Sequence, residues 1–429
     1  MKYDSTWESL DSRPVPEWFA DAKFGIFIHW GLYSVPAFAN KGGLAEWYLH
    51  ALKNECEHHA EFVEHHEKIY GKNKRYEDFV TDFTAENFNA KEWIDLFTRA
   101  GARYMNLVSK HHDGFCMYKS DYAWNWNSVD VGPGRDFCRE LKDACEGTPV
   151  RFGVYHSIYE WYNPLFLKDP EEYSRKHLLP MLKELIEKYE PATLFIDGEW
   201  DYPDDTWHSR EFLQWLYNES PVKDYIVPND RWGKNTRGVH GGNFTTEYGV
   251  IGLNNEVITD REKPREECRG IAGSFGWNKF ETAEDYLTEG ALIKMFVDLV
   301  SQGSNLLLNV GPTPDGRIPV IMQERLLQMG EWLKTNGEGI YGTRKYAVKD
   351  SGDVRYTKKG DVIYAFLLKF PFGSIVLDDV DYTDGIKVSL MGYDGEIKAE
   401  NENGKLKLVF GAINPDEVKS KYVYGFKIE

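Results

Sequence analysis

Two short apolar runs decide the fold, Arg151-Phe-Gly-Val-Tyr-His-Ser157 and Ala192-Thr-Leu-Phe-Ile-Asp197. Between them, Glu171 to Tyr189 carries apolar residues at helical spacing. Continuous apolar runs of this length are typical of strands that are covered on both faces of a parallel sheet. The stretch therefore predicts two parallel strands joined by a crossover helix.

The same alternation continues along most of the chain. About eight strand-like runs occur, at residues Phe24 to Trp30, Tyr104 to Lys110, Arg151 to Ser157, Ala192 to Asp197, Asp224 to Asp230, Asn243 to Tyr248, Gly270 to Trp277 and Asn305 to Val310. Helical periodicity marks a segment capped by Asn89 and stopped by Gly101, and also Trp207 to Glu219, Tyr286 to Ser301 and Val320 to Thr335. This pattern predicts an α/β fold, a (β/α)8-like TIM-type barrel over residues 1–343, with an open doubly wound sheet as the alternative.

The sequence pattern changes after about Tyr341. Short strand-like runs follow one another, separated by Gly, Asp and Asn turns, at Asp353 to Phe370, Ser374 to Asp379, Lys387 to Met391, Lys405 to Phe410 and Tyr422 to Ile428. We predict a C-terminal antiparallel β-sandwich domain over residues 344–429.

Composition narrows the class of partner. The net charge of −18 repels phosphate backbones and anionic lipid, which argues against nucleic acid and membrane as partners. Aromatic residues make up 15% of the chain, and this excess suits a protein that stacks rings against sugars, although Trp also fills large cores. A homo-oligomer is compatible with this composition.

Cellular location is predicted from two features. Residues 1–13 have neither a basic region nor an apolar region typical of a signal peptide. The five cysteines form an odd set without CxxC spacing, which favours a reducing compartment. We therefore expect a cytoplasmic protein, or a secreted or periplasmic one if a signal peptide has been trimmed.

One insertion, Lys53 to Tyr76, is rich in His and Glu. A metal site is one interpretation. A solvated charged helix is the preferred one, because many carboxylates accompany the histidines and no recognised ligand spacing occurs.

Polar residues gather where the predicted strands end. Barrel active sites form at the carboxyl ends of the strands, from residues on different strands. A single His or Asp at such a place often only holds a loop, but six converging ends favour a site for a polyhydroxylated ring. These ends are His29-Trp30, His111-His112-Asp113, Tyr155-His156, Asp197, Asp230-Arg231-Trp232 and Glu247-Tyr248.

Hydrolysis of a glycosidic bond needs two carboxyl groups, one at the anomeric carbon and one that protonates the leaving oxygen. Asp197 follows an apolar run and precedes a glycine, which allows close approach of a substrate. Glu199 competes for this role and otherwise makes a salt bridge or a loop hydrogen bond. Glu247 is flanked by Thr246 and Tyr248, and a partly desolvated aromatic pocket favours the protonated form of a carboxyl group.

These residues also carry a family resemblance. The chain resembles the α-L-fucosidases of glycoside hydrolase family 29 over nearly all of residues 1–343. The matching blocks include Trp18-Phe-Ala-Asp-Ala-Lys-Phe-Gly-Ile-Phe-Ile-His-Trp-Gly31, Glu46-Trp-Tyr48, Lys110-His-His-Asp-Gly-Phe115, Asn229-Asp-Arg-Trp-Gly233, Thr245-Thr-Glu-Tyr248, Ser274-Phe-Gly-Trp-Asn278 and Asn305-Leu-Leu-Leu-Asn-Val-Gly-Pro312. Their order and combination make the resemblance specific.

The resemblance implies a retaining exo-glycosidase that removes terminal α-L-fucose from fucosylated glycans through a covalent fucosyl-enzyme, without a metal or cofactor. Asp197 matches the family's nucleophile. Residues that match or adjoin positions holding the sugar or shaping its pocket are His29, Glu46, Trp47, His111, His112, Tyr155 and Arg231. Trp47 and Phe275 offer apolar surface for the C5 methyl group of fucose.

The acid/base residue lies in a variable part of this family. Glu247 matches the pattern of one branch, and Glu266 is the alternative because relatives commonly read Trp-Glu there. This chain departs with Arg265 in place of that Trp. It also has Phe195 where many relatives carry Trp, which affects the fine contacts of the pocket rather than the chemistry.

Two other functions compete with hydrolysis by paired carboxylates. A metal-dependent barrel hydrolase would use His29, His111, His112 and Asp197 as ligands. A catalytically silent fucose-binding protein on the same scaffold would bind the sugar without cleaving it.

Overall fold

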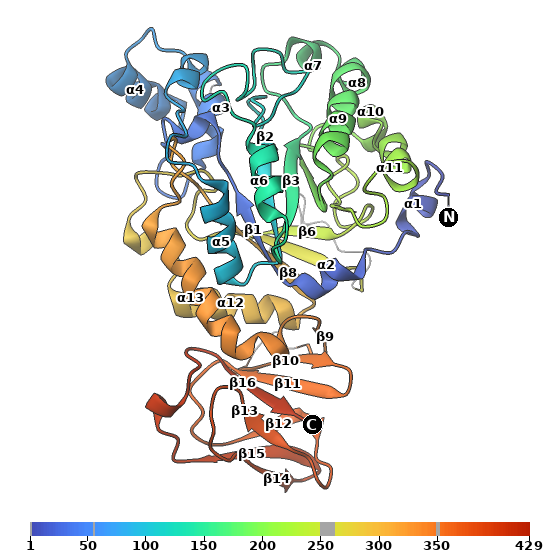
Figure 1. The fold of residues 1–429 in the computed structure, drawn as a ribbon, viewed down its shortest axis with the longest axis vertical. Helices are drawn as coiled ribbons and strands as arrows, with labels where there is room; N and C mark the ends of the chain where they lie inside the picture. Colours follow the sequence, from blue (N-terminus) through green and yellow to red (C-terminus); the bar gives the residue numbers. More distant parts are fainter. Residues whose placement is uncertain (1, 55, 249–261, 349–351) are drawn as a thin grey trace.

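The computed structural model describes residues 2–54, 56–248, 262–348 and 352–429. Figure 1 shows an upper body built on strands β1 to β8 and a lower body built on β9 to β16, with helices α12 and α13 between them.

The upper body is a barrel. Within the described residues, eight strands form one parallel sheet in the order β5-β4-β3-β2-β1-β8-β7-β6. The first strand thus pairs with both the second and the last, as in a barrel and unlike a doubly wound sheet, so the predicted (β/α)8-like fold class is confirmed. The sheet is open between β5 and β6, where the N–H of Asn243 donates to the carbonyl of Pro228 (3.1 Å). The strands are β1 (Phe24–Ile28), β2 (Tyr104–Lys110), β3 (Arg151–Ser157), β4 (Thr193–Asp197), β5 (Val227–Pro228), β6 (Phe244–Glu247), β7 (Arg265–Gly270) and β8 (Ser304–Val310).

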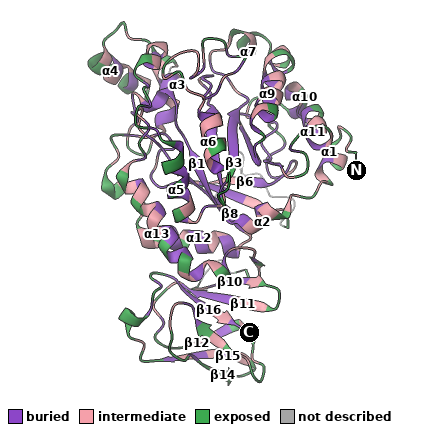
Figure 2. Cartoon of the chain, viewed as in Figure 1, coloured by how far each residue is buried: buried purple, intermediate pink, exposed green. Residues whose placement is uncertain are grey.

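Helices surround this sheet, and the one that contains Phe19 and Ala22 packs these residues against the inward-facing side chains of the strands. The helices are α1 (Trp7–Asp11), α2 (Glu17–Ala22), α3 (Tyr48–Lys53), α4 (His59–Tyr70), α5 (Ala90–Ala100), α6 (Phe137–Cys145), α7 (Pro164–Lys168), α8 (Pro170–Tyr173), α9 (Leu179–Tyr189), α10 (Asp204–Trp207), α11 (Ser209–Asn218), α12 (Glu289–Ser301) and α13 (Val320–Asn336). Figure 2 shows the barrel strands buried and the outer faces of the helices exposed. Between β5 and β6, all of whose connection is described, the chain forms no helix.

Local sequence explains helix α5. The Asn89 side chain accepts from the backbone N–H of Lys91 and Glu92, and Gly101 ends the helix in the left-handed region at φ 88°. Trp93 and Phe97 lie on its buried face. The predicted caps are therefore confirmed, and the helix is fixed against the barrel by its apolar stripe.

The seventh strand was predicted wrongly. Residues 271–277 form a loop, whereas β7 runs earlier, over Arg265–Gly270. The segment was not recognised as a strand because it is rich in charged residues, whereas a barrel strand is expected to be apolar. They find polar partners instead: Glu266 accepts from the Tyr104 hydroxyl (2.6 Å), and Arg269 Nε donates to Glu267 (2.6 Å).

The helix predicted over Glu171 to Tyr189 is interrupted. A π-helical turn, Ser174–Leu178, joins α8 to α9, and Pro180 stands in the first turn of α9. Proline has no N–H to donate, so the regular hydrogen-bond ladder cannot continue through this point.

The lower body is the predicted antiparallel β-sandwich. In the part of the chain that is described, its sheets have the orders β13-β16-β11-β10-β9 and β12-β15-β14. The strands are β9 (Arg344–Lys345), β10 (Val354–Lys359), β11 (Val362–Leu367), β12 (Gly373–Asp381), β13 (Val388–Leu390), β14 (Lys398–Glu402), β15 (Lys405–Gly411) and β16 (Tyr424–Ile428). Trp332 Nε1 of α13 donates to the carbonyl of Val423 (2.9 Å), which ties the sandwich to the barrel. The boundary between residues 343 and 344 stays a prediction.

The His- and Glu-rich insertion contains helix α4, in agreement with the interpretation of this segment as a charged helix. Residue 55 of this insertion lies outside the described residues. One face of the helix is buried through Phe62 and His66. His66 contacts the Tyr48 hydroxyl (2.8 Å) and the Lys74 carbonyl (2.8 Å), so this histidine holds the insertion to the barrel.

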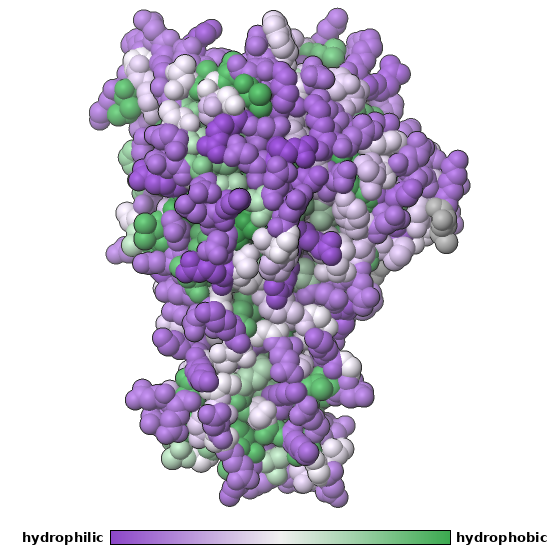
Figure 3. All heavy atoms as spheres, viewed as in Figure 1, coloured by the Kyte–Doolittle hydropathy of each residue, from purple (hydrophilic) through white to green (hydrophobic). Residues whose placement is uncertain are grey.

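The surface fits the charge of the chain. Figure 3 shows a face that is mostly hydrophilic, with scattered hydrophobic atoms. In the described ranges, the helices are too short or too polar to span a membrane.

Candidate active site

A cavity of about 540 Å³ opens at the carboxyl ends of the barrel strands. Every predicted site residue lines it: His29, Glu46, Trp47, His111, His112, Tyr155, Asp197, Arg231, Glu247 and Phe275. These side chains come from distant parts of the sequence, so the barrel brings them together.

Asp197 is the last residue of β4 and lies at the centre of this cavity's hydrogen bonds. Its Oδ2 accepts from the Tyr155 hydroxyl (2.9 Å), and its Oδ1 accepts from Arg231 Nη1 (2.8 Å). Burial alone would raise the pKa of Asp197, but the charge of Arg231, aided by His112 and Arg237, outweighs burial and lowers the pKa to about 2. Asp197 is therefore ionised at neutral pH and can act as a nucleophile.

Arg231 joins the two candidate carboxylates. Its Nη1 binds Asp197, while its Nη2 donates to Glu247 Oε2 (3.2 Å) and its Nε donates to Thr245 Oγ1 (3.0 Å). The guanidinium also lies 4.8 Å above the Phe195 ring. Retaining glycosidases hold their two carboxyl groups close together, roughly 5 to 5.5 Å apart, and contact with one guanidinium likewise brings Asp197 and Glu247 near each other.

Glu247 differs from Asp197 in its access to water. The side chain of Glu247 is 35% exposed, against 14% for Asp197. A general acid that later serves as a base must exchange protons with water, whereas a nucleophile needs no such access. The difference in exposure fits the two predicted roles.

The histidines are neutral hydrogen-bonding groups. Burial lowers the pKa of His29 and of His112 to about 4, and it lowers the pKa of His111 well below its usual range. His29 Nδ1 contacts Asn309 Oδ1 (2.7 Å), and Asn309 Nδ2 donates to the Phe275 carbonyl (2.6 Å). Since the amide is oriented in this way, Nδ1 of His29 carries the proton and Nε2 is left as an acceptor for a substrate hydroxyl.

His112 is oriented in the same manner. Ser157 Oγ donates to the Tyr159 carbonyl (2.7 Å) and so accepts from His112 Nδ1 (2.5 Å). His112 Nε2 then lies 3.8 Å from Asp197 Oδ2 with no proton between them. A sugar hydroxyl placed at this point would find acceptors on both sides.

Comparison with known proteins decides the family. A family model described as alpha-L-fucosidase matches residues 1–338, and one described as the alpha-L-fucosidase C-terminal domain matches residues 349–429. The chain belongs to the α-L-fucosidase family. The predicted resemblance and the predicted class, a glycoside hydrolase acting on α-L-fucosides with retention, are thereby confirmed.

Individual relatives agree over most of the chain. The plasma alpha-L-fucosidase of Rattus norvegicus is 45% identical over 86% of this chain and 81% of that one. The tissue alpha-L-fucosidase of Homo sapiens is 39% identical over 100% of this chain and 92% of that one. A crystal structure of the Thermotoga maritima alpha-fucosidase in complex with a mechanism-based inhibitor superposes with a TM-score of 0.84, at 35% identity and full coverage of both chains.

An α-L-fucosidase must recognise a methyl group at C5. Phe275 stacks on His29, with ring centroids 4.9 Å apart, and Trp47 packs on His112 with centroids 5.6 Å apart. Glu46, beside Trp47, accepts from the Gly276 N–H (2.8 Å), and burial raises its pKa to about 7. The pocket therefore pairs apolar ring surface with a carboxyl group that can donate or accept.

The two alternative acids lie elsewhere. Glu266 is buried on β7 against Tyr104, and burial raises its pKa to about 7. Glu199 is bound by Arg237. Neither glutamate lines the cavity.

The fucosidase cavity also has walls that the sequence prediction missed. They are Phe27, Leu44, Trp200, Asp201, Arg237 and Cys268, whereas Phe195 and Tyr248, which also line it, were named from the sequence as a pocket contact and a strand end. Trp200 and Asp201 follow Asp197 by three and four residues, a signal that could have been used. Arg237 comes from the irregular β5–β6 connection, where no strand or helix pattern places a side chain.

The metal-dependent alternative finds no support in the geometry. Among the described residues, no cluster of three or more His, Cys, Asp or Glu side chains is arranged to hold a metal ion.

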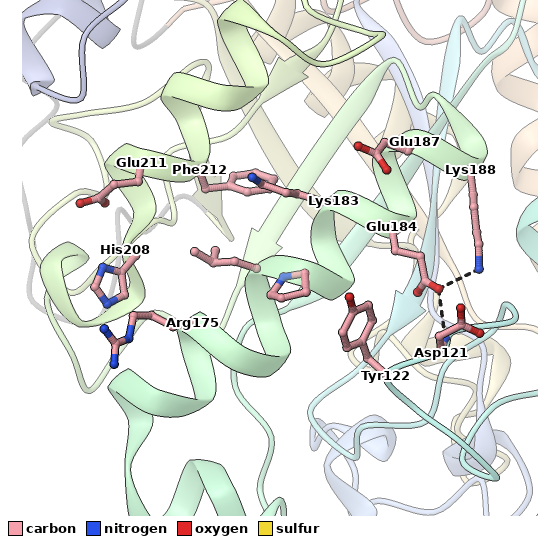
Figure 4. A pocket seen from close by; sticks show the side chains of 12 residues that line it. Asp121, Tyr122, Arg175, Lys183, Glu184, Glu187, Lys188, His208, Glu211 and Phe212 are labelled. Carbon is pink, nitrogen blue, oxygen red and sulfur yellow. Dashed lines mark hydrogen bonds and ion pairs between the residues drawn. The ribbon is translucent and has the colours of Figure 1, made fainter.

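A second cavity lies on the outer wall of the barrel. It measures about 680 Å³ and lies between α9, α11 and the loop at Asp121 and Tyr122 (Figure 4). Its charged rim surrounds Leu179, Pro180 and Phe212. It contains none of the predicted site residues, so it is separate from the fucosidase site.

Proposed function

We propose that Asp197 is the nucleophile and Glu247 the acid/base residue in the release of terminal α-L-fucose from fucosylated glycans. The observation that carries this proposal is the contact of one guanidinium, that of Arg231, with both carboxylates inside the same cavity.

The first half of the reaction forms the fucosyl-enzyme. A carboxylate oxygen of Asp197 attacks the anomeric carbon, and the bond from that carbon to the leaving oxygen breaks. Glu247 donates its proton to the leaving oxygen. The ester formed at Asp197 no longer carries a charge, so Arg231 then interacts mainly with Glu247, which has become a carboxylate.

The second half releases the sugar. Glu247 removes a proton from a water molecule, and the resulting hydroxide displaces Asp197 from the anomeric carbon. Two displacements at the same carbon restore its original configuration. The neutral histidines accept hydrogen bonds from the sugar hydroxyls through both steps.

Solved relatives support a covalent route. The Thermotoga maritima alpha-fucosidase was solved with a mechanism-based inhibitor, and a fucosynthase form of it, 34% identical to this chain, with alpha-L-Fuc-(1-2)-beta-L-Fuc-N3. We propose fucosylated glycans as the substrates of this chain on the same basis.

Leaving groups of different acidity test the acid/base assignment. In Glu247→Ala, an aryl fucoside with an acidic phenol should keep its glycosylation rate far better than a disaccharide, because the phenolate leaves without a proton. Glu266→Ala is the matched control and should treat the two substrates as the wild type does. The reverse pattern would transfer the role to Glu266.

Location and assembly remain predictions. We propose a cytoplasmic location, supported by the cysteines, which are all free thiols in the described residues. Cell fractionation would test it. We also propose a homo-oligomer, which light scattering on the purified chain would test.

A further inference from the structure

A buried ion pair stands beside the nucleophile and has no part in the reaction as described. Glu199 Oε1 accepts from Arg237 Nε (2.9 Å) and from Arg237 Nη2 (2.6 Å). The side chains of Glu199 and Arg237 are only 4% and 8% exposed. Removing two charges from water is costly, so a pair of this kind calls for an explanation beyond stability.

Arg237 lies between two carboxylates. Its Nη2 is 3.9 Å from Asp197 Oδ1 and lines the cavity, but it is much closer to Glu199. The nucleophile therefore feels the charge of Arg237, which helps to lower the pKa of Asp197, without a direct hydrogen bond from it.

The backbone fixes this arrangement. Gly198 separates the two acids and adopts φ 90°, a conformation that side-chain-bearing residues rarely take. A Cβ at this position would also lie 2.5 Å from the Cβ of Tyr159. The turn at Gly198 sets the Glu199 side chain beside Arg237, while Asp197 lines the cavity.

Glu199 depends on Arg237 in turn. Burial raises the pKa of Glu199, and the charge of Arg237 is the largest opposing influence. Its Oε2 has no hydrogen-bond partner in the described part of the chain. Arg237 is thus the group that most favours the ionised form of Glu199.

We propose that Glu199 is a positioning residue that keeps Arg237 from donating a direct hydrogen bond to Asp197. This inference rests on the proposed role of Asp197 as the nucleophile. With Glu199 neutral, the nearest carboxylate for Arg237 is Asp197, about one ångström beyond hydrogen-bond distance.

A direct bond from Arg237 would slow the reaction. Asp197 already accepts from Tyr155 and Arg231, and every further donor stabilises its charge before attack more than during it. Such stabilisation of the ground state raises the barrier. The prediction is therefore that neutralising Glu199 harms catalysis only while Arg237 is present.

Three variants test this dependence: Glu199→Gln, Arg237→Gln and the double variant. On an aryl fucoside, Glu199→Gln should lower kcat by roughly 10- to 100-fold with little change in KM, the range expected of coupled neighbours. Arg237→Gln should lower kcat by less than about fivefold, since Glu199 can then take up a proton. The double variant should match Arg237→Gln and so recover most of the activity that Glu199→Gln loses.

Recovery by a second substitution separates positioning from a structural role. If the pair only held the loop together, the double variant would be as slow as Glu199→Gln or slower, and the inference would be overturned. An unchanged kcat in Glu199→Gln would overturn it as well. Should Glu199→Gln not fold, Glu199→Asp keeps the charge but shortens the reach to Arg237, and its loss should again be relieved by Arg237→Gln.

The variants also distinguish a failure of this inference from a failure of the proposed nucleophile. Inactivity of Asp197→Ala combined with an unchanged Glu199→Gln would refute this inference alone. An active Asp197→Ala would refute the proposed nucleophile, whatever the result for the pair.

Discussion

The mouth of the barrel and its interior each hold a buried acid on a strand, but the two acids differ in charge. Asp197, at the mouth, has a pKa lowered to about 2 because arginines outweigh its burial. Glu266, deep on β7, has a pKa raised to about 7 by burial, with a tyrosine hydroxyl as its partner. Burial alone therefore does not determine whether an acid is ionised, because a paired cation lowers the pKa of Asp197 in spite of its burial.

The two sites also differ in the partners of their acids. Around Asp197, Arg231 satisfies two carboxylates at once. Around Glu266 the neutral pairing with Tyr104 requires no ion to leave water.

The largest effect should come from the acid at the mouth. We expect Asp197→Ala to lower kcat by at least about 1000-fold, because the substitution removes the proposed nucleophile. External azide should restore turnover, because it can occupy the space left by the Asp197 carboxylate and attack the anomeric carbon in its place. An unchanged circular dichroism spectrum would establish folding, and unchanged activity would remove the assignment.

Removing the bidentate cation should have the next largest effect. In Arg231→Lys a single ammonium group replaces the guanidinium, whose three nitrogens bind Asp197, Glu247 and Thr245. We expect kcat to fall by roughly 100-fold. Arg317→Lys, at an exposed ion pair with Asp315, is the control and should behave as wild type. Equal kcat values for the two variants would mean that the guanidinium geometry of Arg231 does not contribute to turnover.

The aromatic wall should contribute less. Phe275→Ala opens space beside His29, where the C5 methyl group is expected. We predict a loss of roughly 10-fold in kcat/KM for an α-L-fucoside, with a smaller loss for the α-L-galactoside, which carries a hydroxymethyl group there. Parallel losses on both substrates would show that Phe275 does not contribute to selectivity.

The interior acid should affect stability rather than turnover. We expect Glu266→Gln to keep kcat within about twofold of wild type. Because the folded pKa of Glu266 is about 7 and its usual value is 4.5, the folded wild type binds a proton that the unfolded chain has lost between these values. The unfolding free energy of the wild type should therefore fall across this range, by up to about 3 kcal/mol.

Urea unfolding at pH 5 and pH 8 measures this difference. Relative to wild type, Glu266→Gln should gain stability on going from pH 5 to pH 8. Identical differences at both pH values would mean that Glu266 is ionised in the folded protein, contrary to the contrast drawn here.

The sequence was most informative where local pattern and chemistry coincide. Asp197 follows an apolar run and Glu247 ends a strand with Thr residues, so both could be placed at the mouth from spacing alone. β7 was missed because its charges contradict the expected apolar pattern, and the partner of Glu266, Tyr104, is distant in sequence.

Contacts between loops could not be predicted in this way. Arg237 approaches Asp197 from a connection without regular structure. The fork of Arg231 between two carboxylates also depends on side-chain directions that spacing does not encode. Sequence motifs could predict which residue types meet, whereas only the fold determines which atoms do.

Trapping the intermediate tests the central claim most directly. A 2-deoxy-2-fluoro fucoside with an activated leaving group forms the covalent intermediate faster than water releases it, because the fluorine slows both steps and the leaving group restores the first. After proteolysis, mass spectrometry should find the fluorosugar on the peptide that contains Leu194 to Trp200, with fragmentation locating it on Asp197. Attachment to Glu199 or Glu247, or an active enzyme that never becomes labelled, would contradict the account.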